Sequence, residues 1–216
     1  MPAPHPAEAP VGEDWPTISD DLLKGLVHAL NNRVASLSAS VELARLGDEE
    51  EDLLTVLPEE IAQLHGVNAL FALLPQRKAE AESLELRAVL DDAIRLHEHH
   101  PKFRGGQVDL TFEGAPAVVR APRWALLRSM VMLVHAAKGD ARSERGRVDA
   151  AIRVHGADET ISARVATHGA PSADLVALAA RCGGVVVRTD DELVLTLPSL
   201  RELRRREREG RGESAG

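Results

Sequence analysis

A heptad pattern of apolar residues between positions 23 and 44 constrains the fold more than any other feature. Spacings of four and three residues alternate through three repeats, as in a helix that packs one stripe against another helix. Thr17 and Asp20 have the spacing of a capping box and predict the start of this helix, and Gly47 predicts its end. The stripe consists of Leu23, Val27, Leu30, Val34, Leu37, Val41 and Ala44.

A second helix is predicted after the acidic residues 48–52, which suit the positive end of a helix dipole. Pro58 lies early in it, where a helix tolerates a kink, and Pro75 ends it. Two helices joined by a few residues form an antiparallel hairpin, which cannot bury both apolar stripes alone. We therefore expect residues 17–76 to form a homodimer, in which two hairpins make a four-helix bundle. The second stripe is Leu53, Leu57, Ile61, Leu64, Val67, Phe71 and Leu74.

A different pattern begins after the polar residues 76–83. Short alternating strands and amphipathic helices intermix, which favours an α/β sandwich over residues 84–198 with helices on one face of a sheet. The predicted fold class is therefore α+β, with an N-terminal helical hairpin and a C-terminal α/β sandwich. Helices are expected at 86–97, 122–138 and 172–181, and strands at 107–112, 117–120, 148–154, 160–166, 184–188 and 192–197.

The two ends of the chain differ from these domains in composition. Residues 1–16 are rich in proline, alanine and acidic side chains, which predicts a flexible N-terminus. Residues 199–216 form a charged tail, in which six arginines stand against four glutamates from Arg201 onward. Because these opposite charges interleave, we expect a solvated helix end that frays, rather than an RNA-binding arm.

Composition excludes several classes of function. A net charge of −8 and an aromatic content of 2% disfavour nucleic-acid binding, which depends on positive charge and on base stacking. No apolar run approaches the ~18 residues that a membrane span needs, and the N-terminus lacks the basic and apolar regions of a signal peptide. We therefore expect a cytoplasmic protein without a membrane partner. The single cysteine, Cys182, excludes an internal disulfide and is expected to be buried packing.

The residues from His28 onward read HALNNRVASLSASVELARL. This segment resembles the phosphoacceptor region of sensor histidine kinases, in which a histidine and a Leu-Asn-Asn triplet open the dimerisation helix. The resemblance implies that His28 accepts a phosphoryl group. Because Val27 belongs to the apolar stripe, we expect His28 to lie just outside it and to face solvent. An imidazole is largely neutral at cellular pH, and its free nitrogen can attack phosphorus.

Three neighbours of His28 complete the predicted site. Lys24 and Asn32 lie four residues to either side of His28, on the same helical face. Lys24 could offset the incoming charge, and Asn32 could bond the phosphoryl group or orient a water for dephosphorylation, as the resemblance implies. Arg33 adds positive charge toward the acidic pocket of a response-regulator receiver domain. Ala29, however, stands where the kinases carry an acidic base, whose contribution is typically ~100-fold or more.

Residues 84–198 resemble the ATP-binding domain of the same kinases in the order and spacing of their elements. The residues that bind nucleotide in that family differ here. His135 replaces the magnesium-binding asparagine, and Thr167 and His168 replace an Asp-Asn pair that reads adenine. The chain after Gly169 lacks the glycine-rich phosphate lid. We therefore expect a degenerate domain without a bound cofactor, and Mg²⁺ only on the partner receiver.

Residues 97–100 read HEHH and invite a metal-site interpretation, because His97 and His100 are three residues apart. No cysteine or further ligand pair lies nearby in the sequence. We favour a helix C-terminus that prefers partly cationic side chains and that stops at Pro101.

These features together predict a histidine phosphotransferase of a two-component phosphorelay. His28 would take a phosphoryl group from a receiver aspartate and pass it to another receiver, without ATP. One alternative is an active histidine kinase with a divergent ATP site. Another is a non-catalytic dimeric protein that binds a receiver, and a phosphatase role through Asn32 is compatible with the same fold.

Overall fold

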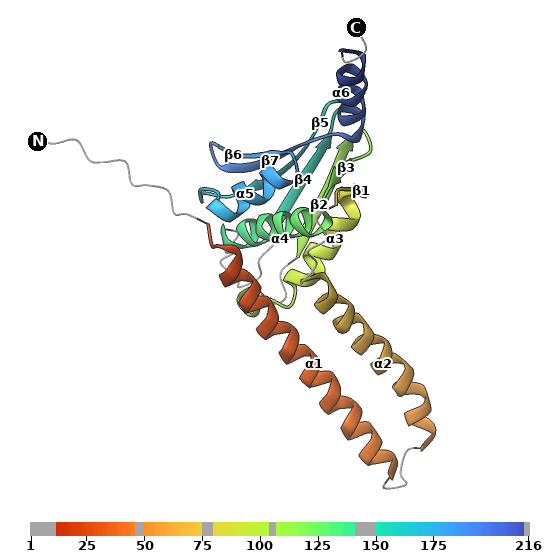
Figure 1. Ribbon diagram of the computed structural model, residues 1–216. Coiled ribbons are helices and arrows are strands. Elements are labelled where there is room, and N and C mark those ends of the chain that lie inside the picture. The colour runs from red at the N-terminus through yellow and green to blue at the C-terminus, as the bar shows by residue number, and fades with distance from the viewer. Residues whose placement is uncertain (1–11, 46–49, 75–79, 104–106, 141–149, 214–216) are drawn as a thin grey trace, which may run out of the picture.

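The computed structural model describes residues 12–45, 50–74, 80–103, 107–140 and 150–213. A long helical hairpin projects from one end of a C-terminal α/β domain (Figure 1). This arrangement confirms the predicted α+β class. Within the described residues, no helix has both the length and the apolarity that crossing a bilayer requires.

The hairpin consists of α1 (Trp15–Arg45) and α2 (Glu50–Leu73), as the two apolar patterns predict. The predicted capping residue of α1 is wrong. The helix begins two residues earlier than Thr17, because the Asp14 carboxylate accepts a hydrogen bond from the Thr17 amide at 3.0 Å. The predicted stops at Gly47 and Pro75 lie outside the described residues.

Residues 12–16 contact the C-terminal domain, unlike the flexible N-terminus expected over 1–16, and residues 1–11 lie outside the described residues. The Gly12 amide donates to the Ala170 carbonyl at 2.9 Å, and the Trp15 amide donates to the Asp174 carboxylate at 2.9 Å. The Arg128 guanidinium lies 4.8 Å from the centre of the Trp15 ring, within cation–π range. We call residues 12–18 the N-terminal strap. It ties the start of α1 to the domain.

The C-terminal domain is built on a five-stranded sheet covered on one face by helices (Figure 1). Burial alternates along β4, so that one face of the sheet packs on the core and the other faces solvent. The strand order is β2 (Val108–Gly114), β4 (Ala150–Gly156), β5 (Thr160–Ala166), β7 (Glu192–Pro198) and β6 (Val185–Thr189), with only the β2–β4 pair of this sheet parallel. The covering helices are α3 (Leu86–His97), α4 (Arg123–Asp140) and α5 (Ala173–Arg181).

Helix α4 is the centre of the core. Nearly all of its residues between Ala125 and Val134 are buried, because α3, α5 and the sheet surround it. The core is aliphatic, as the low aromatic content requires. Cys182 belongs to it, and burial raises the pKa of its thiol to about 12, which confirms the prediction of packing rather than reactivity.

Three elements differ from expectation. The strand β1 (Glu82–Glu85) pairs with β3 (Val118–Ala121) in a separate small sheet, although its sequence ESLE carries no apolar alternation. A 3-10 turn, η1 (Pro101–Phe103), follows α3. The tail, expected to fray, is helical as α6 (Leu200–Glu213), and the side chain of its first-turn residue Glu202 is buried.

Helix α1 also packs closely on the domain along a face that starts at the last residue of the strap. Ile18, Leu22 and Leu26 are almost completely buried. Gly25 lies so close to the connection between α3 and η1 that an added Cβ would stand 1.7 Å from the His99 carbonyl oxygen. Only glycine allows this approach of two backbones.

We expect Gly25→Ala to lower the free energy of unfolding by about 1–3 kcal/mol, because α1 must move away from His99. Gly66→Ala in α2 is the matched control, since a Cβ there meets nothing within 4 Å. That control should stabilise the protein by about 0.5–1 kcal/mol through helix propensity. Urea denaturation of both variants measures the difference, and equal effects would contradict the close contact.

Candidate functional site

The predicted apolar stripe of α1 is largely exposed in a single chain. Leu23, Val27, Val34 and Val41 are between 40% and 49% exposed. The residues of α1 that pack on the domain belong instead to a neighbouring face that begins with Ile18. The stripe is therefore available to a second helix from outside this chain.

His28 lies on the exposed surface of α1, as its place beside Val27 predicts. The side-chain amide nitrogen of Asn32 lies 3.4 Å from Nε2 of His28. An amide nitrogen donates, so this contact is compatible with the tautomer that carries its proton on Nδ1 and accepts at Nε2. In that tautomer Nε2 presents the lone pair that a nucleophilic imidazole requires.

A hollow of about 400 Å³ lies beside His28. The hairpin supplies most of its lining, including the predicted site residues Asn32 and Arg33. The connection after α3 supplies the remaining wall through Glu98 and His99. Residues of the hairpin and of the C-terminal domain thus lie together beside His28, the candidate phosphoacceptor. Glu98 and His99 belong to the HEHH motif, but no pattern in the sequence predicted that they line the same hollow as His28.

The two predicted basic residues differ in their surroundings. Lys24 forms ion pairs with Asp20 at 2.5 Å and Asp21 at 3.7 Å, and it does not line the hollow. The bond to Asp20 raises the pKa of the exposed Lys24 ammonium. Arg33 lines the hollow and lies 3.6 Å from Glu60 of α2. Of the four predicted site residues, the structure brings together His28, Asn32 and Arg33.

A second group of histidines is buried inside the domain. His97 and His100 are fully buried and His135 nearly so, and all three pack around Phe103. Nε2 of His97 lies 3.2 Å from Nδ1 of His135. Burial lowers the pKa of His97 to about 2 and that of His135 to about 4, so these rings are neutral at pH 7.

This burial corrects the interpretation of His97 and His100 as partly cationic side chains at a helix end. His97 closes α3 as expected, but its ring points into the core and stays uncharged. Within the described ranges, no three histidine, cysteine, aspartate or glutamate side chains converge in a way that could hold a metal ion.

Two of the three positions compared with a nucleotide site line a cavity of about 480 Å³. His135 and Thr167 line it, together with Glu13 of the N-terminal strap. The Glu13 carboxylate lies 3.4 Å from Nε2 of His135 and 3.4 Å from the Lys102 ammonium, whose pKa it raises. His168 points to the surface, where its Nδ1 lies 3.2 Å from the Asp191 carboxylate. The chain itself thus supplies the charged groups of this cavity.

Comparisons with known proteins give structural neighbours only. No protein-family model matches the sequence, and no curated protein does. A bacterial phosphotransferase is 13% identical, with a TM-score of 0.42 over 88% of this chain and 99% of its own. The Acinetobacter baumannii histidine kinase AdeS is 13% identical, with a TM-score of 0.43 over 80% of this chain and 96% of its own.

The catalytic domain of the histidine kinase ThkA is 12% identical, with a TM-score of 0.42 over 56% of this chain and 96% of its own. The identities and TM-scores are low in all three cases. The function of this chain is therefore inferred from its own residues.

The buried histidines predict a specific dependence of stability on pH. Their pKa values in the folded protein lie below the unfolded value of about 6.5, so under pH 6.5 the unfolded chain binds protons that the folded chain does not. We expect His135 to contribute no slope above pH 7 and a falling free energy of unfolding between pH 6.5 and about 4. Urea denaturation at a series of pH values measures this slope.

His135→Gln removes one of these titrations and should flatten the slope in that range. His155→Gln, on the exposed face of β4, is the control and should keep the wild-type slope. A wild-type slope in His135→Gln would show that the acid sensitivity arises elsewhere.

Proposed function

We propose that this chain is a histidine phosphotransferase of a two-component phosphorelay. Nε2 of His28 attacks the phosphorus of an aspartyl phosphate on a receiver domain. An N–P bond forms while the O–P bond to the aspartate breaks, and the aspartate leaves as a carboxylate. The same steps in reverse transfer the group to the aspartate of another receiver. We expect Mg²⁺ to bind to the receiver, beside the aspartate that is phosphorylated.

One observation supports this proposal most directly: His28 is exposed, and the side-chain amide nitrogen of Asn32 lies 3.4 Å from its Nε2. A nucleophile that reacts with a site on another protein must be accessible and must present a lone pair. The weak 3.4 Å contact can break when phosphorus approaches. The freed amide of Asn32 can then donate to a phosphoryl oxygen.

The hollow beside His28 gives the receiver a two-sided docking surface. Arg33 lies on the hairpin side, where a cation attracts the acidic residues around a receiver's aspartate. Glu98 and His99 lie on the side of the C-terminal domain. That domain would therefore hold the receiver in place, a role that needs no nucleotide.

The surroundings of His135 support a phosphotransferase that does not load itself from ATP. Its ring is neutral and buried and contacts His97 and Glu13, so an imidazole nitrogen stands where the resembling kinases carry an asparagine oxygen for Mg²⁺. The buried Thr167 offers a hydroxyl in place of a carboxylate for adenine. The Glu13 carboxylate would also repel a triphosphate.

The exposed stripe on α1 supports a homodimeric four-helix bundle. Leu23, Val27, Val34 and Val41 expose apolar surface along several turns of one helix. Burial of such a stripe against a second copy stabilises a bundle by roughly 25 cal/mol per Å² of apolar surface. His28 lies beside this stripe, so dimerisation leaves it accessible.

Phosphotransfer tests the proposal directly. A receiver phosphorylated with ³²P should label the wild-type protein, and His28→Ala should take up no label. His65→Ala, which removes an exposed histidine of α2, is the control and should label like the wild type. Labelled ATP with Mg²⁺ should label none of the three proteins.

The remaining outcomes separate the alternatives. Strong labelling of the wild type by ATP would identify an active kinase and contradict the proposal. Equal receiver binding by wild type and His28→Ala, with no transfer by either, would identify a non-catalytic interaction protein. Faster loss of phosphate from the receiver without label on His28 would identify a phosphatase, and Asn32→Ala should then abolish that loss.

Dimerisation is tested separately. Val34→Glu places a charge in the exposed stripe of each copy, so repulsion and desolvation should convert the dimer to a monomer in sedimentation velocity. Val176→Glu, at a 46% exposed position of α5 in the C-terminal domain, is the control and should stay dimeric. A wild-type monomer, or a Val34→Glu variant that stays dimeric, would contradict the predicted interface.

A further inference from the structure

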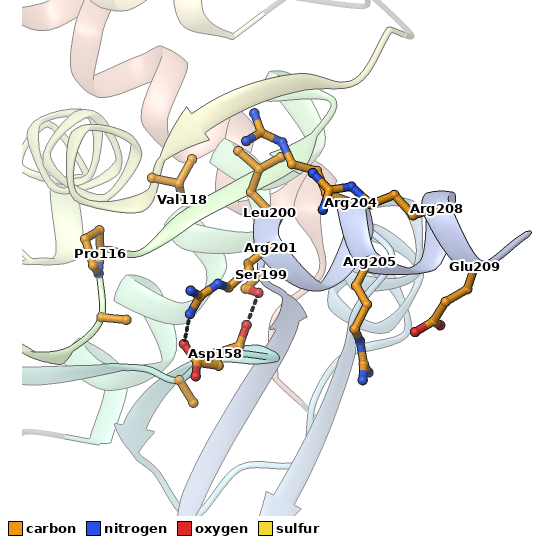
Figure 2. Close-up of a pocket in the computed structure, with 12 residues that line it drawn as sticks. Pro116, Val118, Asp158, Ser199, Leu200, Arg201, Arg204, Arg205, Arg208 and Glu209 are labelled. Carbon is orange, nitrogen blue, oxygen red and sulfur yellow. Dashed lines mark hydrogen bonds and ion pairs between the residues drawn. The ribbon is translucent and has the colours of Figure 1, made fainter. Parts of the chain in front are cut away.

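A second hollow lies beside α6 (Figure 2). Helix α6 stands at the end of the C-terminal domain that is remote from the hairpin tip (Figure 1). The volume of this hollow is about 730 Å³, within the range of sites that enclose small molecules. Three separate segments form it: the connection between β2 and β3, the turn between β4 and β5, and α6. We call it the α6 pocket.

The start of α6 is held firmly at this pocket. Ser199 Oγ donates to the Asp158 carbonyl at 2.5 Å and accepts a hydrogen bond from the Glu202 amide at 3.0 Å, so Ser199 caps the helix. The Arg201 guanidinium pairs with the Asp158 carboxylate at 2.5 Å (Figure 2). These bonds join α6 to the β4–β5 turn and fix the shape of the pocket.

The pocket is basic although the chain as a whole carries a net charge of −8. Four arginines line it against two acidic residues, Asp158 and Glu209. Two of these arginines already have acidic partners: Arg201 pairs with Asp158, and Arg205 with Glu202 at 2.8 Å and Glu159 at 3.2 Å.

Arg204 and Arg208 differ from those two. Neither forms an ion pair with any residue in the part of the chain that the structure describes. They stand four residues apart on α6, where like charges destabilise a helix by a few tenths of a kcal/mol. An anion bound between them would relieve this repulsion and would accept charge-assisted hydrogen bonds from both.

Apart from the capping residue Ser199, the rest of the pocket lining is apolar. Pro116 and Val118 come from the β2–β3 side, and Leu200 comes from the first turn of α6 (Figure 2). A ligand that fills the pocket therefore meets a hydrocarbon surface and two guanidinium groups that have no acidic partner among the described residues. Inorganic phosphate alone would leave that surface in contact with water.

We propose that the α6 pocket binds a soluble organic anion with a phosphate or carboxylate head and an apolar body. The head contacts Arg204 and Arg208, and the body lies over Val118 and Leu200. A concave site made by three segments suits a single molecule better than a flat membrane surface or an extended acidic peptide. This site is independent of His28 and adds a ligand to the C-terminal domain.

Octyl phosphate is the probe, and isothermal titration calorimetry with the full chain is the measurement. The wild type should bind octyl phosphate, and Arg204→Gln with Arg208→Gln should weaken that binding by about tenfold or more. Arg206→Gln is the matched control, because Arg206 pairs with Glu202 at 2.6 Å and does not line the pocket. It should bind like the wild type.

The apolar side of the pocket is tested in the same assay. Val118→Thr keeps the shape of the side chain but replaces one methyl group with a hydroxyl, so octyl phosphate should bind more weakly. Octanol and inorganic phosphate should each bind the wild type more weakly than octyl phosphate. Circular dichroism checks that each variant remains folded.

Three results would overturn the proposal. One is equal affinity of the wild type and the double arginine variant for octyl phosphate. Another is equal affinity of the wild type for inorganic phosphate and octyl phosphate. The third is binding only to vesicles of phosphatidylglycerol and phosphatidylcholine, or only to a glutamate-rich peptide, which would assign these arginines to a membrane or a protein surface.

Discussion

The close contact between α1 and the connection after α3 sets the geometry on which the rest of the site depends. Gly25 lets the helix approach the His99 backbone, and Ile18, Leu22 and Leu26 bury apolar surface around that contact. The hollow beside His28 exists because this contact brings residues of the C-terminal domain to the helix. The absence of a Cβ at Gly25 therefore decides how close His28 lies to Glu98 and His99, which form the second wall of the hollow.

The interior behind this contact is unusual because it contains three buried histidine side chains. His97, His100 and His135 are buried as neutral rings, a form whose transfer from water costs far less than that of a charged ring. The N-terminal strap brings Glu13 to the mouth of the same region, beside Lys102. Charges of the chain itself thus offset one another in this region.

The sequence predicted those elements in which apolar side chains repeat with the period of a helix or of a strand. The heptad pattern gave both long helices, and Thr160–Ala166 is a strand with the predicted bounds, because its apolar side chains alternate at a period of two. The strand β1 was missed because its pairing with β3 is a tertiary contact. Glu98 and His99 were missed for the same reason: their approach to His28 depends on Gly25, 73 and 74 residues away in sequence. Periodicity carries no information about such contacts.

The anchoring of α1 has a mechanical consequence. The helix has 31 residues, so it is about 46 Å long, and the strap and Gly25 hold it only within its first third. Leu26 is the last residue of α1 that is buried against the domain, and beyond it the helix packs beside α2 of the same hairpin. A rotation of the hairpin about the domain would therefore displace the far end of α1 much more than His28, which stands two residues past Leu26. The proposed nucleophile thus lies at the pivot end of a lever, where its position relative to the C-terminal domain changes least.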